Sequence, residues 1–522
     1  MALLLLFTVL AAAAVVASSL LLRWNEVRYS RRRGLPPGTM GWPLFGETTE
    51  FLKQGPSFMK ARRLRYPPTP SHAPVRAAAV ASAFRRHPCS ALSSHAMNGT
   101  ERNATELCHA VPGAASSDQS FGGKYGSLFR THILGCPTVV CMDPELNRRT
   151  LASEGAGFVP GYPQSMLDIL GPNNIAAVHG PLHRAMRGAM LALTRPSMIR
   201  AALLPKIDAF MRAHLHGWAG RRVDIQEMTK EMALLSALRQ IAGISAGPLS
   251  DALKAELYTL VLGTFSLPIN IPGTNYSKGL QARKKLVAML RQMIIDRRSS
   301  GCAQDDMLDA LLSGNEGTRA KLSDDQIIDL LIALIYSGYE TVSTTSMMAV
   351  KYLSDNSKAL EQIRKEHLDI RKGKSPGDAL DWNDYKSMTF TKAVIYETLR
   401  LATVVNGLLR KTTQDVEMNG YVIPKGWRIY VEINYDPFLY PEPMVFNPWR
   451  WLEKGLESHP HFMLFGGGSR MCPGKEVGTV EIATFLHYFI TQYRWEEEGN
   501  NTISKFPRVA APNGLHIRVQ DY

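Results

Sequence analysis

The most apolar stretch of the chain lies at its start. Residues 2–22 carry no charge, and arginines follow at Arg23 and Arg28. A run of this length is enough for a helix that spans a bilayer, and a basic flank marks the cytosolic end. We therefore predict a single-pass membrane anchor over 1–22, with the rest of the chain in the cytosol. A cleaved signal peptide is the alternative, but the run has no basic residues before it and no clear cleavage site after it.

After the apolar run, the composition of the chain changes at residue 23 and again at residue 67. Residues 23–50 form a predicted basic and proline-rich hinge, because prolines fix φ and remove backbone donors, and a basic helix is expected over 51–66. Residues 67–125 are rich in Pro, Ala, Ser and Gly without sustained periodicity. A structureless run of that length is unusual inside a compact domain. We interpret 67–125 as a non-native insertion, from a retained intron or a misassembled exon, into a catalytic domain that spans 51–522. A surface loop is the alternative.

Beyond residue 125 the periodic order returns. Alternation over 133–142 predicts a strand, 158–175 has the glycines and prolines of a loop, and 198–298 is mostly amphipathic helix. Ser323 and Gln326 form a capping box ahead of a long apolar run, so a helix is expected from there to about Leu353. Another apolar helix is expected over 477–489. The chain is thus predicted to be mainly α with a smaller β region.

Composition adds less than the pattern does. The chain is 45% hydrophobic and 20% charged, an ordinary balance for a globular protein. Its formal net charge of +14 suits an anionic membrane surface or an acidic protein partner. No basic stripe interleaved with aromatic residues appears, so no nucleic-acid partner is expected. The six cysteines contain no Cys-x-x-Cys pair, as is usual in a reducing compartment.

One glycine-rich stretch near the C-terminus, Phe465–Gly474, holds the most specific chemistry. Its glycines let the backbone press against a planar group, Cys472 can supply a thiolate ligand, and Arg470 suits a carboxylate. The dipole of the helix that follows favours the thiolate. A glycine-rich turn around a buried structural cysteine is the alternative. The pattern Phe-x-x-Gly-x-Arg-x-Cys-x-Gly resembles the cysteine-ligand loop of cytochromes P450, which are haem-thiolate monooxygenases. The resemblance implies a cytochrome P450 fold and haem b, with Cys472 as the axial iron ligand and Phe465, Arg470 and Gly474 in contact with the cofactor.

Three further basic or aromatic positions fit the same family. His183 and Arg187 lie at i and i+4, on one face of an expected helix. The family places such a pair, often Trp and Arg, against the haem propionates, and His takes the place of Trp here. A solvated basic face is the alternative. Arg410 resembles another arginine that meets a propionate in the family.

The second long apolar helix carries Ser-Gly-Tyr-Glu-Thr in its middle, at 337–341. Polar groups inside a buried helix are costly unless each has a partner or a function. Gly338 permits close approach of a ligand, and the Thr341 hydroxyl can bond the carbonyl of Ser337. The resemblance assigns Glu340 and Thr341 to proton delivery on the oxygen side of the haem. A core helix with satisfied polar residues is the alternative.

Scaffold motifs follow in the order that the family shows. Glu397-x-x-Arg400 carries no information alone, but Arg450 follows about fifty residues later within Pro-x-x-Phe-x-Pro-x-Arg-Trp. The resemblance implies a buried ion network of these three residues beneath the haem loop. One departure lies near Tyr430, where the chain is about three residues shorter than the family pattern. Because an odd change of register turns side chains to the opposite face of a strand, the packing beneath the haem is in doubt there.

Longer stretches narrow the resemblance. Those that begin at Arg23, Gly41, Pro160, Ser337 and Phe446 closely resemble the plant brassinosteroid C-6 oxidases. This implies oxidation of 6-deoxocastasterone or a related steroid to castasterone at the endoplasmic reticulum membrane, with electrons from NADPH through NADPH-cytochrome P450 reductase. The alternatives are another sterol or triterpenoid hydroxylase of the family, a haem-thiolate isomerase or dehydratase that needs no reductase, and an inactive splice or gene-model variant. The candidates for the lining of a steroid pocket are Leu334, Val404, Val405, Asn406 and Leu515.

Overall fold

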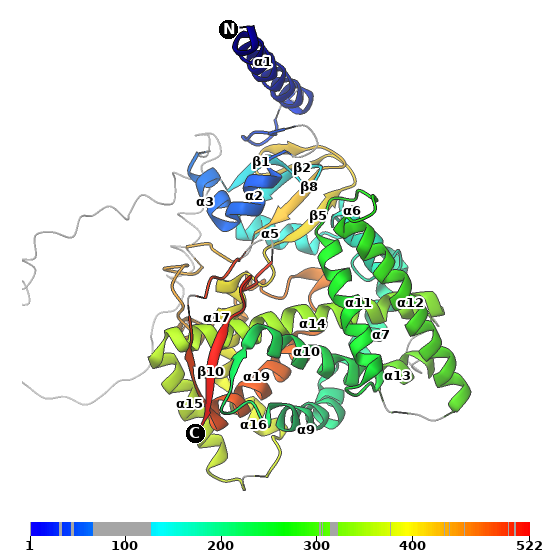
Figure 1. The fold of residues 1–522 in the computed structure, drawn as a ribbon, viewed down its shortest axis with the longest axis vertical. Helices are drawn as coiled ribbons and strands as arrows, with labels where there is room; N and C mark the ends of the chain where they lie inside the picture. Colours follow the sequence, from blue (N-terminus) through cyan, green and yellow to red (C-terminus); the bar gives the residue numbers. More distant parts are fainter. Residues whose placement is uncertain are drawn as a thin grey trace, which may run out of the picture.

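The computed structural model describes residues 2–30, 34–42, 46–65, 127–301, 304, 306–313, 322–375, 377–432, 434–437, 439–453, 455–499, 501–505 and 508–522. The predicted insertion at 67–125 lies outside the described residues. The described part is mainly helical, with its largest sheet on the side from which helix α1 projects (Figure 1). The predicted fold class is therefore confirmed.

The chain starts with one continuous helix, α1 (Ala2–Ser30), which runs beyond the predicted anchor and into the predicted hinge. Its last turns pack on the domain. Asn25 is buried and donates to the carbonyls of Met40 and Gly41 at 3.2 and 2.8 Å, and Glu26 accepts from the Met40 N–H at 2.8 Å. The location of residues 1–22 in a membrane stays a prediction.

Two short helices, α2 (Thr48–Gln54) and α3 (Pro56–Arg65), replace the single basic helix expected over 51–66. That expectation was wrong because of the residues between them. Gly55 adopts φ 49° and ψ −119°, which is not helical, and Pro56 has no N–H with which to continue the hydrogen-bond ladder.

The largest sheet has the strand order β1-β2-β8-β5-β3. Strands β1 and β2 form an antiparallel hairpin whose turn, Leu134–Gly135, has positive φ at both residues. The single strand expected over 133–142 was wrong, because this turn lies within it. Strand β8 is parallel to β2 and antiparallel to β5. The bounds are β1 (Leu128–Ile133), β2 (Cys136–Cys141), β8 (Arg428–Val431), β5 (Leu408–Thr412) and β3 (Phe158–Pro160).

Two smaller sheets complete the β structure. One has the order β4-β10-β9 and the other is the hairpin β6-β7. Their bounds are β4 (Arg222–Asp224), β6 (Val416–Met418), β7 (Tyr421–Ile423), β9 (Tyr493–Glu497) and β10 (His516–Asp521).

The helices make up the rest of the domain, and the capped helix predicted from Ser323 is α14. The Ser323 hydroxyl accepts from the Gln326 N–H at 3.3 Å, and the Gln326 side chain accepts from the Ser323 N–H at 3.0 Å. The bounds are α5 (Pro144–Ala152), α6 (Gln164–Leu170), α7 (Gly180–Leu193), α8 (Pro196–Met198), η3 (Ile199–Leu203), α9 (Leu204–Leu215), α10 (Ile225–Ala242), α11 (Pro248–Thr264), α12 (Asn275–Ser300), α13 (Met307–Ser313), α14 (Asp324–Asp355), α15 (Ser357–Arg371), α16 (Trp382–Ser387), α17 (Thr389–Ala402), α18 (Trp449–Glu453), η4 (Leu456–Ser458), η5 (Gly468–Arg470) and α19 (Lys475–Gln492).

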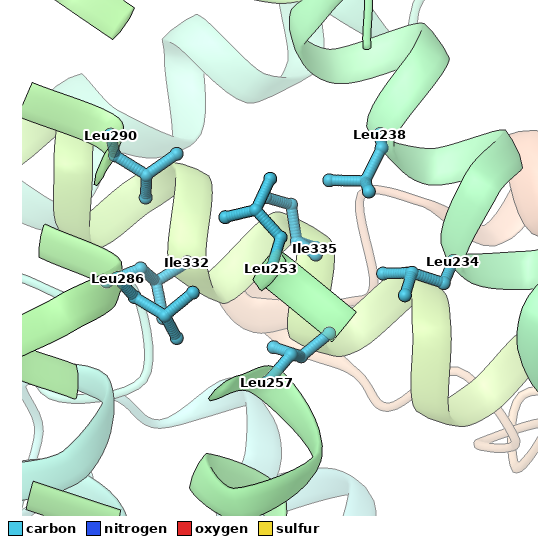
Figure 2. Close-up of a pocket in the computed structure, with 8 residues that line it drawn as sticks. All are labelled: Leu234, Leu238, Leu253, Leu257, Leu286, Leu290, Ile332 and Ile335. Carbon is cyan, nitrogen blue, oxygen red and sulfur yellow. The ribbon is translucent and has the colours of Figure 1, made fainter. Parts of the chain in front are cut away.

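Helix α14 passes through the middle of the helical region, among α10, α17 and α19 (Figure 1). It has the length and apolar composition of a membrane span, but 67% of its most apolar window is buried inside the protein, so it is a core helix. A cavity of about 10 Å³ lies among α10, α11, α12 and α14 (Figure 2). Its lining is entirely aliphatic, which suits neither a haem nor a polar ligand: Leu234, Leu238, Leu253, Leu257, Leu286, Leu290, Ile332 and Ile335.

Strand β8 contains Tyr430, near which the sequence predicted that the chain is shortened. The strand pairs on both sides, and Tyr430 is buried. Its hydroxyl is buried without a hydrogen-bond partner among the described residues, and its ring lies so close to Gly407 that a Cβ atom there would be 2.5 Å away. An unpaired buried hydroxyl costs about 1–3 kcal/mol. The shortening of the chain near Tyr430 stays a prediction.

Replacing Tyr430 by Phe should leave stability unchanged or raise it, because the change removes the unpaired hydroxyl and keeps the ring. The matched control is Tyr493→Phe, since the buried Tyr493 hydroxyl donates to the Leu215 carbonyl at 2.7 Å. The control should lower the free energy of unfolding by about 1 kcal/mol. Urea unfolding followed by tryptophan fluorescence measures both, and an equal loss in the two variants would contradict the prediction.

Candidate active site

The cysteine loop connects η5 to α19 and folds back on itself. The Cys472 N–H donates to the Phe465 carbonyl at 2.8 Å. Gly468 adopts a φ of 65°, a left-handed value that a side chain would resist. The N–H groups of Gly474 and Lys475, where α19 begins, point at the Cys472 sulfur. The sulfur therefore lies at a helix N-terminus, as the sequence indicated.

Cys472 combines two properties that are seldom found together. Its side chain is accessible, yet burial raises the pKa of its thiol above the usual value, against the opposing effects of the Gly474 N–H and the Arg187 charge. The sulfur is therefore accessible but closely surrounded by protein atoms. The thiolate is the form that binds metals, and a metal there would lower the pKa of the thiol.

Helix α14 has an open face at its polar interruption. Ser337 is exposed, whereas the neighbouring Tyr339 is buried. The Thr341 hydroxyl donates to the Ser337 carbonyl at 2.8 Å, as predicted. The start of α19 touches this helix beside Thr341, because a Cβ atom built on Gly478 would lie 3.9 Å from the Val342 side chain. The polar stretch of α14 and the cysteine loop thus border the same region.

Glu340 has a partner that the sequence did not suggest. Its carboxylate lies 3.1 Å from Nε of Arg508, in the segment before β10. Burial raises the pKa of Glu340, while the charges of Arg508 and Lys230 act in the opposite direction. A polar cavity of about 10 Å³ adjoins these side chains, with room for about one water molecule. Glu340 therefore contacts a site that can hold a water.

Helix α7 contributes His183 and Arg187 to this region, and strand β5 contributes Arg410. Burial, with the nearby charge of Arg470, lowers the pKa of His183 to about 4, so this ring is neutral at pH 7. Arg187 lies close enough to Cys472 for a thiolate there to raise its pKa, although burial lowers it more. Arg410 is buried, and its Nε has no hydrogen-bond partner among the described residues. Burial lowers the pKa of Arg410 as well.

Arg470 is already held by protein groups. Its Nε and Nη2 donate to the two carboxylate oxygens of Glu154, each at 2.6 Å. Nη1 donates to the Ile175 carbonyl at 2.8 Å, and Nη2 also donates to the Val178 carbonyl. Glu154 was not among the residues predicted from the sequence.

The predicted scaffold residues meet as expected, with additional partners. Glu397 has no accessible surface and accepts from Arg400 at 2.8 and 3.0 Å and from Arg450 at 3.1 Å. The indole N–H of Trp451 and the backbone N–H of Asn447 donate to the same carboxylate at 2.9 and 3.0 Å. Trp451 then leads to the cysteine loop through a chain of ring contacts, Trp451–Phe462–Phe465.

The predicted substrate residues divide into two groups. Leu334, Val404 and Asn406 are half-buried, and Val405 is 37% exposed. Leu515 has no accessible surface and belongs to the apolar core. As contacts of a substrate, these residues stay a prediction, and Leu515 could take part only after a rearrangement.

The residues around Cys472 fit a haem. A buried arginine nitrogen without a partner, at Arg410, and a second partly buried cation, at Arg187, match a group that carries two carboxylates. Backbone N–H groups aimed at the sulfur match an anionic axial ligand. Glycines lie on both sides of Cys472 and leave space beside it. A Cβ atom added at Gly474 would contact only the Cys472 sulfur, at 3.9 Å.

Comparison with known proteins agrees with this chemistry. Residues 112–516 match the Cytochrome P450 family. The chain is 75% identical to Cytochrome P450 85A1 of Oryza sativa subsp. japonica over 512 residues, which cover 97% of each chain. The chain belongs to the cytochrome P450 family, and the resemblance found at Phe465–Gly474 is confirmed. It is therefore a haem-thiolate oxidoreductase of the monooxygenase class, which takes electrons from a redox partner.

More distant relatives extend the comparison. The chain is 53% identical to Cytochrome P450 85A2 of Arabidopsis thaliana over 96% of each chain. It is 34% identical to 3beta,22alpha-dihydroxysteroid 3-dehydrogenase of Arabidopsis thaliana, over 93% of this chain and 92% of that protein. Among solved structures, a retinoic acid-bound cyanobacterial CYP120A1 superposes with a TM-score of 0.75 at 25% identity, over 94% of this chain and 99% of that one.

Changing Cys472 to Ser should abolish the thiolate spectrum, because a neutral hydroxyl does not donate comparable electron density to iron. The carbon-monoxide difference spectrum of the reduced protein measures this. Cys141→Ser is the matched control, since Cys141 is buried in β2, in a cluster separate from the main core. A thiolate-type band that persists in Cys472→Ser would show that another residue is the ligand.

Proposed function

We propose that this protein oxidises C-6 of 6-deoxo brassinosteroids, converting 6-deoxocastasterone or a close relative to castasterone. The observation that carries the proposal is the 75% identity to Cytochrome P450 85A1 over 97% of each chain, together with an intact cysteine loop. The stretches that resemble plant brassinosteroid C-6 oxidases lie at 23–29, 41–48, 160–168, 337–345 and 446–451, so they are spread over the whole chain.

Haem, when bound at Cys472, supplies the activation of dioxygen. The contribution of the protein is to hold the cofactor and to move protons. Arg187 and Arg410 would hold the propionates by charge, and the N–H groups of Gly474 and Lys475 would stabilise the thiolate. The Thr341 hydroxyl is anchored on the Ser337 carbonyl at 2.8 Å, and from this position it would pass protons toward the cofactor.

The proton supply is assigned to Glu340. It contacts the water-sized cavity shared with Arg508. Burial raises its pKa while two cations oppose that rise, and we assign to this carboxyl group the exchange of protons with the cavity. Proton transfer would therefore run from the cavity through Glu340 to Thr341.

The side chains proposed to face the steroid are Leu334, Val404, Val405 and Asn406. Apolar contacts discriminate weakly between sterols, so a polar group must read a steroid hydroxyl, and Asn406 is the proposed one. NADPH-cytochrome P450 reductase is the proposed electron donor, and the +14 net charge would favour an acidic partner. Residues 1–22 of α1 are proposed to anchor the protein in the endoplasmic reticulum membrane, with the catalytic domain in the cytosol.

A second candidate is oxidation of another sterol at a different carbon. The observation that favours it is the 34% identity to a protein whose name describes a steroid 3-dehydrogenase. The steroid class is common to both candidates, and they differ in the position that is oxidised.

Microsomes that contain the protein and a reductase should convert 6-deoxo brassinosteroids to 6-oxo products and leave simple triterpenes unchanged. Mass spectrometry of the products, with the Cys472→Ser protein as the blank, measures both. Oxidation of the steroid at another carbon would favour the second candidate, and oxidation of the triterpene alone would exclude both.

Thr341→Ala should still bind substrate and accept electrons, but more of the electrons should end in peroxide because proton delivery is mistimed. The ratio of NADPH consumed to product formed measures this. The matched control is Thr345→Ala, one turn along α14, where the hydroxyl makes the same type of bond to the Thr341 carbonyl at 2.7 Å but is buried in the core. If the ratio of NADPH consumed to product formed is unchanged in Thr341→Ala, another hydroxyl must deliver the protons, and Ser343 would be the next candidate.

A further inference from the structure

One lysine side chain connects the two ends of the loop that carries Cys472. Lys475 is the first residue of α19, and its backbone N–H points at the Cys472 sulfur. Its side chain reaches back to the start of the loop, where Nζ lies 5.0 Å from the centroid of the Phe462 ring and 5.6 Å from that of the Phe465 ring. Lys475 therefore contacts the chain on both sides of the cysteine.

The ammonium group of Lys475 lies over three rings that also pack against one another. The third ring is that of Tyr396 on α17, whose centroid lies 5.8 Å from Nζ. It contacts the rings of Phe462 and Phe465 at 5.7 and 5.9 Å between centroids, and those two lie 6.2 Å apart. We call these three rings the ring cage. A cation is attracted to a ring within about 6 Å of its centroid, and more strongly where water is excluded. Only 20% of the Lys475 side chain is exposed.

A carboxylate completes the surroundings of the ammonium group. Oε1 of Glu457, in η4, accepts from Nζ of Lys475 at 2.8 Å and from the Tyr396 hydroxyl at 3.0 Å. Burial raises the pKa of Glu457, but the interactions with Lys475 and Tyr396 outweigh that effect and hold the pKa below its ordinary value. Glu457 is therefore an anion at neutral pH, and it ties the start of α19 to η4.

The backbone bonds around the sulfur depend on where α19 begins. The Cys472 N–H donates to the Phe465 carbonyl at 2.8 Å, and the N–H groups of Gly474 and Lys475 point at the sulfur. Groups that donate to a metal ligand orient it and tune the metal that it binds. A shift of the start of α19 relative to Phe465 would change these bonds, and the Lys475 side chain is a contact that opposes such a shift.

We propose that Lys475 is a positioning residue of the haem site. Its ammonium group, held by the ring cage and by Glu457, closes the cysteine loop and keeps the N–H groups at the start of α19 directed at the Cys472 thiolate. This inference rests on membership of the cytochrome P450 family and not on the proposed steroid substrate. Its readouts need no substrate, so its failure and that of the proposed function can be told apart.

The test uses the full-length haem protein and two readouts. The first is the rate at which the reduced protein loses its thiolate-type carbon-monoxide band in urea, and the second is the reduction potential of the haem. Lys475→Met keeps the length of the side chain and removes the charge. The band should be lost about tenfold faster, as the loss of a partly desolvated cation–ring contact implies. The potential should fall, because weaker N–H bonds leave more electron density on the sulfur.

Glu457→Gln separates position from charge. This change removes an anion, so an effect of charge alone would raise the potential. If Glu457 acts by holding Lys475 in place, the potential should instead fall and the band should be lost faster, as in Lys475→Met but to a smaller extent. Lys475→Arg keeps a cation that can lie over the rings, and it should stay close to the wild type in both readouts.

Lys392→Met is the matched control for charge. It removes a cation from the same neighbourhood, since the charge of Lys392 also acts on Glu457. Its Nζ lies 4.3 Å from the centroid of the Tyr385 ring, which is outside the ring cage. Both readouts should therefore stay close to the wild-type values.

Three results would overturn the proposal. An unchanged potential in Lys475→Met would mean that the contact only stabilises the fold. A potential that is unchanged or raised in Glu457→Gln, or a shift in Lys392→Met as large as that in Lys475→Met, would mean that position is not what matters. If Lys475→Met takes up no haem, the other two variants decide. Faster loss of the band in Glu457→Gln together with retention in Lys475→Arg supports the proposal, and any other combination refutes it.

Discussion

The carboxylate of Glu397 has no access to solvent, and the position of the cysteine loop depends on keeping it paired. Arg400 and Arg450 neutralise it, while Trp451 and Asn447 fill its remaining acceptor positions. Removing one partner of a buried ion pair typically costs about 3–5 kcal/mol, because the other charge is left unpaired. The network therefore fixes the register of α17 against the segment around α18, and the aromatic chain from Trp451 extends this order to Phe465.

The site is built from two kinds of charge pairing with different consequences. The Glu397 network and the Glu154–Arg470 pair are closed, since their charges cancel within the protein. Arg187 and Arg410 are open, and a bound cofactor would complete their balance. Buried open charges of this kind destabilise a protein that lacks its ligand. Haem binding and folding are therefore expected to be coupled, as in other proteins whose ligand binds the native state alone.

Most features that the sequence predicted correctly were encoded by neighbouring residues, and the exception is Arg450, which the family resemblance, not its spacing, placed with Glu397. The capping box at Ser323, the Thr341–Ser337 bond and the Cys472 loop each lie within one helical turn or one loop. The break at Gly55–Pro56 and the turn at Leu134–Gly135 were also local, and they were missed because a single helix and a single strand were each extended across residues that interrupt them. Glu154, Arg508 and Trp451 could not be found in the same way, because their partners lie elsewhere in the chain. The roles assigned to the site residues, and the nature of 67–125, stay predictions.

The docking of α1 has a consequence for how the chain can be shortened. Its final turns are part of the folded domain, since Asn25 and Glu26 bond the backbone of Met40 and Gly41 and the Tyr29 ring contacts His132 and Trp427. A boundary placed after Ser30 would strip these bonds from the backbone they satisfy. A boundary at Arg23 would remove the apolar part and spare the contacts. The orientation of the domain relative to the axis of α1 is likewise set by hydrogen bonds, so the two cannot swivel freely.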